Sequence, residues 1–151
     1  GGGPPLVLRD SHSPNIVWRP QREGRDRIGL IDFQDAVIGP AAYDVASLAM
    51  DARVTIPPAL ERAMVDAYCA ARAASGGIRG GFDRAGFDLA YAAMAAQRNS
   101  KILGIFVRLN LRDGKPGYMR HLPRIRDYLS RALAHPALSE LRAFYAGAGI
   151  L

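Results

Sequence analysis

The chain has 151 residues, of which 49% are hydrophobic and 23% charged, and its formal net charge at pH 7 is +6. This composition is typical of a globular protein and excludes an intrinsically disordered chain. No apolar run in the sequence approaches the roughly 20 residues that span a membrane. A single cysteine, Cys69, excludes an internal disulfide.

The positive charge is carried by eighteen arginines and only two lysines. Arginine pairs readily with phosphate and carboxylate groups, so an anionic partner is one interpretation. The alternative is that many arginines, together with abundant alanine, reflect genome composition. The first ten residues, GGGPPLVLRD, lack the charged region and the long apolar region of a signal peptide, so we expect a cytoplasmic protein.

The first third of the chain predicts short strands around polar loops. Residues 1–5 are interpreted as a linker or a cloning remnant, and residues 6–8 as a short buried strand. Two apolar, β-prone runs, 16–18 and 28–31, flank a polar segment that contains proline and glycine. This pattern predicts a β-hairpin.

Three polar side chains frame this hairpin. If Ile16 pairs with Ile31, the next residues outward also lie opposite each other. They are Asn15 and Asp32, and their Cβ atoms would lie about 4.5–5.5 Å apart. Oxygen ligands of this kind suit Mg²⁺, which takes only one or two carboxylates from a protein. Asp10 would face the same point and could accept a proton from an attacking hydroxyl, as in the D-x-x-x-x-N and D-F arrangement of protein kinases.

Three runs carry a family resemblance: RDSHSPN from Arg9, IDFQDA from Ile31 and GPAAYD from Gly39. They resemble the C-terminal lobe of the aminoglycoside phosphotransferase family, which has a kinase-like fold. Within it, IDFQDAVIGPAAYD and the later run QRNSKILGIF are similar to bacterial cell-wall amino-sugar kinases, which phosphorylate the anomeric hydroxyl of N-acetylmuramate or N-acetylglucosamine. The resemblance covers nearly the whole chain, but specific motifs lie only in its first third.

The resemblance implies transfer of the γ-phosphoryl group of ATP or GTP to a sugar hydroxyl. Asp10 would be the catalytic base, and Asn15 and Asp32 would bind Mg²⁺. Asp44 would tie the following helix to the catalytic loop, although the residue alone predicts only an N-cap or a first-turn acid. A positively charged chain would not attract polycationic aminoglycosides over distance, so a neutral or carboxylated sugar fits better.

The sequence departs from the family pattern at two positions. Leu8 stands where many members have the histidine of an HxD loop, and Gln34 stands where protein kinases have glycine. His12 is a candidate to replace that histidine in part, but a structural role, hydrogen-bonding the loop, is favoured over direct chemistry. Asp35 is either a second polar group at the site or a turn residue.

The remaining residues have helical patterns. Apolar spacing predicts helices from Tyr43, over 59–74, over 82–111 with a break near Gly104, and around 118–134 and 136–146. The apolar stripe of the helix over 59–74 is expected to comprise Leu60, Met64, Tyr68 and Ala71. The glycine-rich segment 75–81 has no phosphate-loop pattern and is interpreted as a linker. The predicted fold is therefore α+β and mostly helical: a small hairpin beside a helical bundle, as in the large lobe of a kinase-like fold.

One further group is a candidate for substrate binding. Gln97, Arg98 and Lys101 fall within one helical turn, so we expect them to share a face. That face is either solvated or supplies donors to sugar hydroxyls or phosphate.

Kinases of this class also need a glycine-rich covering loop and a strand lysine, and neither precedes Asp10 in these residues. We therefore expect residues 6–151 to form the C-terminal lobe, with the N-terminal nucleotide-binding lobe missing from this chain and the fragment inactive alone. A non-catalytic kinase-like binding module is the alternative, with Leu8 as a sign of decay. A basic nucleic-acid binder is weaker, because no recognition motif is present. The expected partners are a nucleotide and a sugar, without nucleic acid or membrane.

Overall fold

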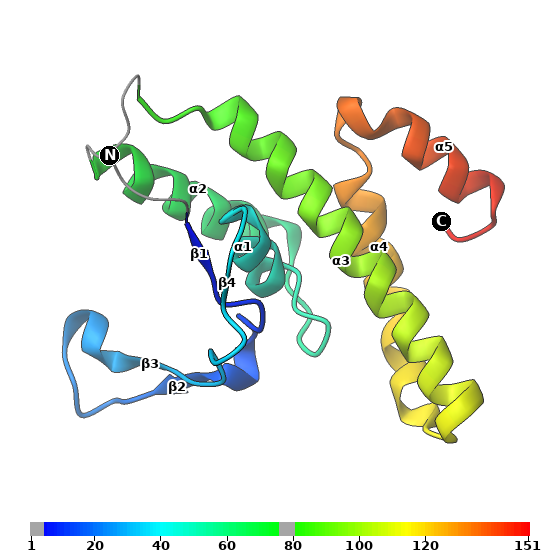
Figure 1. Ribbon diagram of the computed structural model, residues 1–151, viewed down its shortest axis with the longest axis horizontal. Coiled ribbons are helices and arrows are strands. Elements are labelled where there is room, and N and C mark those ends of the chain that lie inside the picture. Colours follow the sequence, from blue (N-terminus) through cyan, green and yellow to red (C-terminus); the bar gives the residue numbers. More distant parts are fainter. Residues whose placement is uncertain (1–4, 76–80) are drawn as a thin grey trace. The chain divides into compact units, whose positions relative to one another are not determined.

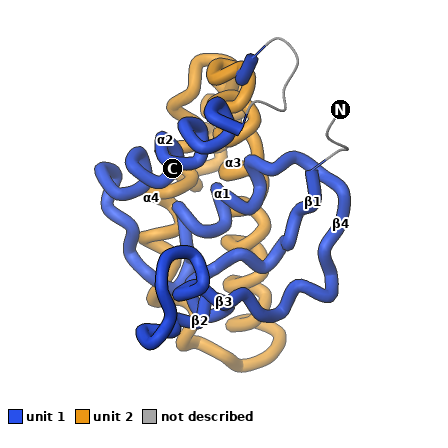
Figure 2. The backbone as a smooth tube through the Cα atoms, turned by 90° about the vertical axis from the view of Figure 1, so that its left-hand side faces the viewer, with its two compact units in different colours: residues 1–82 blue, residues 83–151 orange. Residues whose placement is uncertain are grey.

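The computed structural model describes residues 5–75 and 81–151 (Figure 1). The chain divides into two compact units, residues 1–82 and 83–151 (Figure 2). Small antiparallel sheets belong to the first unit, and helices dominate both. The predicted fold class, α+β and mostly helical, is confirmed. Over the two described ranges, every helix is too short or too polar to cross a bilayer.

The first unit combines short strands with helices. β1 pairs with β4 and β2 with β3, both antiparallel. The strand predicted over residues 6–8 is shorter than expected, and within it only Val7 is buried. The elements are β1 (Leu6–Val7), a 3₁₀ turn (Ser13–Asn15), β2 (Ile16–Trp18), a 3₁₀ turn (Gly24–Arg27), β3 (Ile28–Leu30), β4 (Val37–Ile38), α1 (Ala42–Ala49) and α2 (Pro58–Ala74).

The predicted hairpin is present as β2 and β3, but its register differs from the prediction by one residue. Ile16 lies opposite Leu30, so the prediction that Ile16 pairs with Ile31 is wrong. The amide of Ile31 donates instead to the carbonyl oxygen of Asn15 at 3.1 Å. Register is weakly specified where neither face of a strand pair is buried. The large apolar side chains of β2 and β3 are mostly exposed, so the apolar pattern could not select the register.

Helices α1 and α2 pack against each other. Pro58 occupies the first turn of α2, where its missing N–H costs no helical hydrogen bond. The predicted apolar stripe of α2 is not the buried one, because the interior positions are Glu61, Val65 and Cys69. The predicted members Met64 and Tyr68 are half-buried beside them. The predicted stripe and the buried one are shifted by one residue, which is about 100° around the helix. Because α2 carries apolar side chains on both of these stripes, only packing decides which of them is buried.

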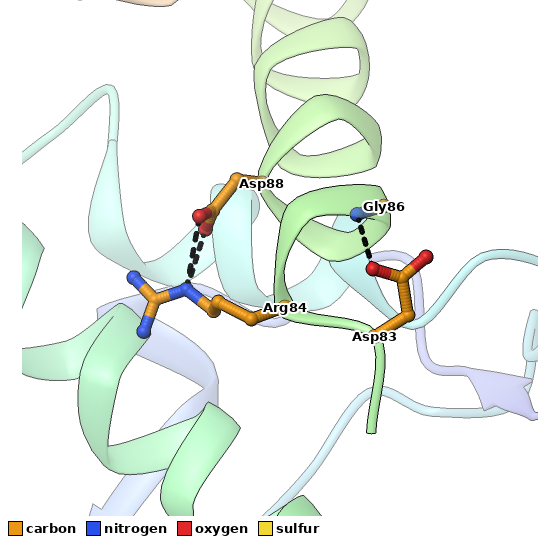
Figure 3. Close-up of polar contacts among 4 residues, drawn as sticks. All are labelled: Asp83, Arg84, Gly86 and Asp88. Carbon is orange, nitrogen blue, oxygen red and sulfur yellow. Dashed lines mark hydrogen bonds and ion pairs between the residues drawn. The ribbon is translucent and has the colours of Figure 1, made fainter. Parts of the chain in front are cut away.

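The second unit begins with α3 (Arg84–Asp113), a helix of 30 residues. The carboxylate of Asp83 accepts a hydrogen bond from the amide of Gly86 at 2.9 Å and caps the helix (Figure 3). The predicted break near Gly104 is wrong, since the helix continues to its left-handed cap at Gly114. A single interior glycine costs a helix only about 1 kcal/mol, which a long packed helix tolerates.

The rest of the second unit follows the predicted helical pattern. Pro116–His121 form a 3₁₀ turn before α4 (Leu122–Ala132), and Pro136–Leu138 form one before α5 (Ser139–Gly147). The apolar spacing of the helix around 118–134 predicts a core stripe of Leu122, Ile125, Leu129 and Leu133, and the last three of these are fully buried. The hydroxyl of Tyr145 on α5 donates to Ser100 Oγ on α3 at 2.6 Å. This bond links the last helix of the unit to the first.

Candidate active site

The loop between β1 and β2 is a series of tight turns. The amides of Asp10 and His12 donate to the carbonyl oxygens of Leu8 and Asp10, both at 2.9 Å. The amide of Asn15 donates to the carbonyl oxygen of His12, also at 2.9 Å. Arg9 adopts the left-handed conformation with a φ of 70°. The turns fold the loop back on itself, so residues five apart in sequence come into contact.

The side-chain amide of Asn15 connects the predicted site residues. Its Nδ2 donates to the carbonyl oxygen of Asp10 at 2.9 Å and to Asp32 Oδ2 at 3.3 Å. Within the described residues, the carboxylate of Asp10 and the Oδ1 atom of Asn15 have no hydrogen-bonding partner of their own. Donation through Nδ2 therefore leaves Asn15 Oδ1 unused, and the side chains of Asp10, Asn15 and Asp32 line the same cavity.

Asp32 reaches Asn15 although the strand register places Ile31, and not Asp32, opposite it. The backbone of Asp32 is left-handed, with a φ of 61°. This conformation is uncommon for residues other than glycine, asparagine and aspartate, and it ends the extended strand. The second oxygen of this carboxylate, Oδ1, accepts a hydrogen bond of 2.6 Å from Gln34 Nε2. The residue that replaces the kinase glycine thus orients the Asp32 side chain, a role that the sequence did not predict.

A cavity of about 590 Å³ opens beside these residues, and its lining comes entirely from the first unit. Asp10, Asn15 and Asp32 line it together with the end of β3, α1 and α2. Apart from Asp44, Tyr68 and Arg72, these elements contribute an apolar wall, which includes Leu30, Ile31, Val45, Leu48 and Met64. The cavity thus has one acidic end and a large apolar side.

Asp44 holds the first half of the loop. Its Oδ2 accepts from the amide of Leu8 at 2.7 Å and its Oδ1 from the amide of Arg9 at 3.0 Å. The helix cap is Ala41, so Asp44 lies in the first turn of α1 and is not its N-cap. The tie between this helix and the loop, which the family resemblance implied, is present.

Asp51 holds the second half of the loop and was missed in the sequence. Its Oδ2 accepts from the amide of Ser13 at 2.8 Å and from the Ser13 hydroxyl at 2.5 Å, and its Oδ1 accepts from the amide of Arg53 at 2.8 Å. Burial raises the pKa of the Asp51 carboxyl, but these hydrogen bonds outweigh it, and the pKa is lowered. A signal was available, because Asp51 follows Asp44 by seven residues, which is two helical turns.

Comparison with known sequences places this site in a family. The sequence model of the phosphotransferase enzyme family matches residues 4–80, which contain the whole loop, the hairpin and both anchoring carboxylates. The chain belongs to the phosphotransferase enzyme family. Its mostly helical architecture agrees with the helical lobe of a kinase-like fold.

Curated relatives of this phosphotransferase family member carry one name. The chain is 44% identical to the N-acetylmuramate/N-acetylglucosamine kinase of Caulobacter vibrioides over 137 residues, which are 91% of this chain and 36% of that protein. It is 40% identical to the kinase of the same name from Pseudomonas putida over 138 residues, 90% of this chain and 39% of that protein. The chain therefore spans less than two-fifths of the length of these relatives.

The positions that depart from the phosphotransferase pattern have local explanations. Leu8 lines the cavity, and its amide is held by Asp44. His12 is buried away from the lining, its main chain holds the loop, and its Nδ1 has no partner in residues 5–75 and 81–151. Asp35 lies in a turn closed by the amide of Ala36, is exposed and does not line the cavity, and its role at the site stays a prediction.

The predicted substrate-binding group lies on α3 in the second unit. Gln97 and Lys101 are exposed, whereas Arg98 is 8% exposed. The prediction that all three share a face is therefore wrong for Arg98. Neighbouring helical residues point about 100° apart, so Arg98 turns inward while Gln97 and Lys101, four residues apart, stay together. None of these described residues lines the cavity.

The donor set at the acidic end of the cavity fits a magnesium ion. Over the described ranges, no group of three histidine, cysteine or acidic side chains could hold a metal ion by itself. Mg²⁺ does not need such a group, because it usually keeps water and phosphate ligands and takes one or two carboxylates. Asp32 Oδ2 and the unused Asn15 Oδ1 are oxygen donors of this kind. A transition-metal site with nitrogen or sulfur ligands does not fit these residues.

Proposed function

We propose that this chain is the large lobe of a small-molecule kinase that transfers the γ-phosphoryl group of ATP or GTP to a hydroxyl of an amino sugar. One observation carries the proposal: in a member of the phosphotransferase family, Asp10, Asn15 and Asp32 meet at one end of a cavity. The names of the curated relatives support N-acetylmuramate and N-acetylglucosamine as substrates.

Asp10 is the proposed base. Its carboxylate lines the cavity and, in the part of the chain that the structure describes, accepts no hydrogen bond. It is therefore available to orient the sugar hydroxyl and to accept its proton as the bond to phosphorus forms. A positioned base of this kind contributes about 10²–10⁴-fold to the rate.

Asn15 and Asp32 are the proposed magnesium ligands. Asn15 Nδ2 is engaged with the Asp10 carbonyl, which fixes the orientation of the amide and leaves Oδ1 for the cation. Gln34 fixes the Asp32 carboxylate from the other side. Bound Mg²⁺ would stabilise the negative charge of the phosphates. The Asn15 amide connects the two sides of the site, because Nδ2 bonds to the Asp10 carbonyl oxygen and to Asp32 Oδ2.

The nucleotide-covering elements belong to a separate lobe in this proposal. The curated relatives extend well beyond the region matched here, since 36–39% of their length is covered. We place the glycine-rich loop and the strand lysine outside these 151 residues and expect the isolated chain to be inactive. The cytoplasmic location and the roles of Gln97, Arg98 and Lys101 stay predictions.

The test is sugar-dependent nucleotide turnover by the full-length gene product that contains this sequence. MgATP and MgGTP are each combined with N-acetylmuramate, N-acetylglucosamine or a cationic aminoglycoside, and nucleoside diphosphate release and sugar phosphate are measured. We expect turnover with an amino sugar and none with the aminoglycoside. Asp10→Asn should lower kcat at least about 100-fold and leave nucleotide binding within a few-fold.

Asp26→Asn is the matched control, because Asp26 is an exposed aspartate near the turn of the hairpin that does not line the cavity. It should retain wild-type turnover. If no sugar is phosphorylated, or if Asp10→Asn is as active as Asp26→Asn, the proposed function is wrong.

A non-catalytic binding module is the second candidate. It is favoured by Leu8, an apolar side chain on the cavity wall at the position where the family resemblance implies a histidine. Against it, the loop conformation does not depend on that histidine, because Asp44 holds the amides of Leu8 and Arg9. Mg²⁺-dependent nucleotide binding without any sugar phosphorylation would favour this candidate over the kinase.

A further inference from the structure

Asp51 is the most buried carboxylate that the proposed chemistry does not use. It lies just after the end of α1, is 1% exposed and does not line the cavity. Its carboxylate nevertheless accepts hydrogen bonds from Ser13, a loop residue 38 positions earlier in the sequence. A buried charge is costly unless hydrogen bonds compensate it, so its retention needs a reason.

The partners of Asp51 satisfy it as an anion. An ionised carboxylate only accepts hydrogen bonds, and Asp51 receives them from Ser13 N, Ser13 Oγ and Arg53 N. Hydrogen bonds to a charged acceptor are shorter and stronger than neutral ones. The electrostatic effect of His12 also lowers the pKa of the Asp51 carboxyl, by less than these bonds do.

Asp51 holds Ser13, which lies two residues before the proposed magnesium ligand Asn15. Ser13 begins the 3₁₀ turn Ser13–Asn15, so its position sets the direction in which this turn delivers Asn15. Asp44 fixes the loop on the other side of Asp10, at Leu8 and Arg9. The two carboxylates therefore hold different halves of the loop, and only the half held by Asp51 carries a proposed magnesium ligand.

We propose that Asp51 is a positioning residue of the phosphoryl-transfer site, which acts through Ser13 to hold Asn15 Oδ1 where the magnesium ion binds. The role rests on the proposed function and deepens it. Residues that orient metal ligands without contacting the metal typically contribute about 10–100-fold to metal affinity or activity. Loss of this anchor should therefore affect the magnesium requirement more than sugar binding.

The test compares Asp51→Asn and Ser13→Ala in the full-length gene product. Ser13→Ala removes the hydroxyl bond and keeps the amide bond, so it perturbs the anchor with little risk to folding. For each variant, kcat, the KM for the sugar and the Mg²⁺ concentration for half-maximal activity are measured at saturating nucleotide. We expect the half-maximal Mg²⁺ concentration to rise about 10-fold or more in Asp51→Asn and by less in Ser13→Ala. The KM for the sugar should stay within twofold, and added Mg²⁺ should restore part of the activity.

The outcomes separate this role from a structural one and from the proposed function. If Asp51 only stabilised the fold, its loss would lower the active fraction without changing the Mg²⁺ dependence, and this result would overturn the inference. Asp26→Asn serves again as the control and should match the wild type. If the wild type itself shows no Mg²⁺-dependent turnover, the proposed function fails and this role fails with it.

Discussion

Replacing Asp44 with alanine should destabilise the first unit by an amount that its two hydrogen bonds determine. The carboxylate accepts from the Leu8 amide in a part-buried setting and from the Arg9 amide in an exposed one. A hydrogen bond to a charged group contributes about 1.5–3 kcal/mol when buried, and the exposed bond is largely replaced by water. The expected loss in the free energy of unfolding is therefore about 1.5–3 kcal/mol, almost all of it from the Leu8 bond.

Urea denaturation followed by circular dichroism measures this loss, with Asp26→Ala as the control. Asp26 is exposed, and surface substitutions usually change stability by less than about 0.5 kcal/mol. If Asp44→Ala costs no more than Asp26→Ala, the two bonds contribute nothing measurable and the reasoning fails.

A second substitution tests whether Asp44 also holds the strained backbone of Arg9. The left-handed conformation of Arg9, with a φ of 70°, costs about 1–2 kcal/mol for a residue with a Cβ atom and almost nothing for glycine. Arg9→Gly should therefore stabilise the protein and make the later loss of Asp44 less costly. Strict additivity of the two substitutions in a double-mutant cycle would contradict this coupling.

The remaining predictions concern the cap of α3, the glycine inside α3 and the pH dependence of the Asp51 anchor. Asp83→Ala removes the cap of α3 and should lower the free energy of unfolding, measured by urea denaturation, by about 1 kcal/mol. Gly86→Ala should also destabilise the protein, because a Cβ at this position meets the Asp83 carboxylate. Gly104→Ala should stabilise by up to about 1 kcal/mol in the same assay, since α3 is continuous there and a Cβ would meet no atom within 4 Å; a loss would indicate a break. The pKa of Asp51 is lower in the folded protein than its unfolded value near 3.8, so the ionised carboxylate contributes its full stability above that value and loses it as the pH falls below it. As the pH is lowered from 7 to 3, the urea midpoint should therefore fall less steeply in Asp51→Asn than in the wild type.

Local patterns were sufficient to predict much of this molecule. The pair of apolar runs predicted the β2–β3 hairpin, and the apolar periodicity of 122–133 predicted the buried stripe of α4. The D-x-x-x-x-N spacing predicted that Asp10 and Asn15 face one point, and in the structure the Asn15 amide bonds to the Asp10 carbonyl oxygen. These features depend on residues that are close in sequence or on a strong repeat.

The features that the sequence did not predict depend on packing between distant segments. The one-residue error in register came from exposed strands, whose apolar pattern favours neither pairing. Asp32 still reaches Asn15, because its left-handed backbone turns the carboxylate toward it, and the tolerance of aspartate for this conformation is too weak a signal to predict the turn. The role of Asp51 depends on donors from Ser13 and Arg53 that meet only in the folded chain.

The two anchoring carboxylates have a mechanical consequence. Asp44 lies in the first turn of α1 and Asp51 just beyond its end, so a rotation of this one short helix acts on the loop at two separate attachment points. Asp10 and Asn15 would then travel together as a rigid block. Asp32 lies outside this loop and is connected to it by the contact of 3.3 Å between Asn15 Nδ2 and Asp32 Oδ2. Any change in the spacing between Asp32 and the loop that carries Asp10 and Asn15 would therefore be concentrated at that one side-chain contact.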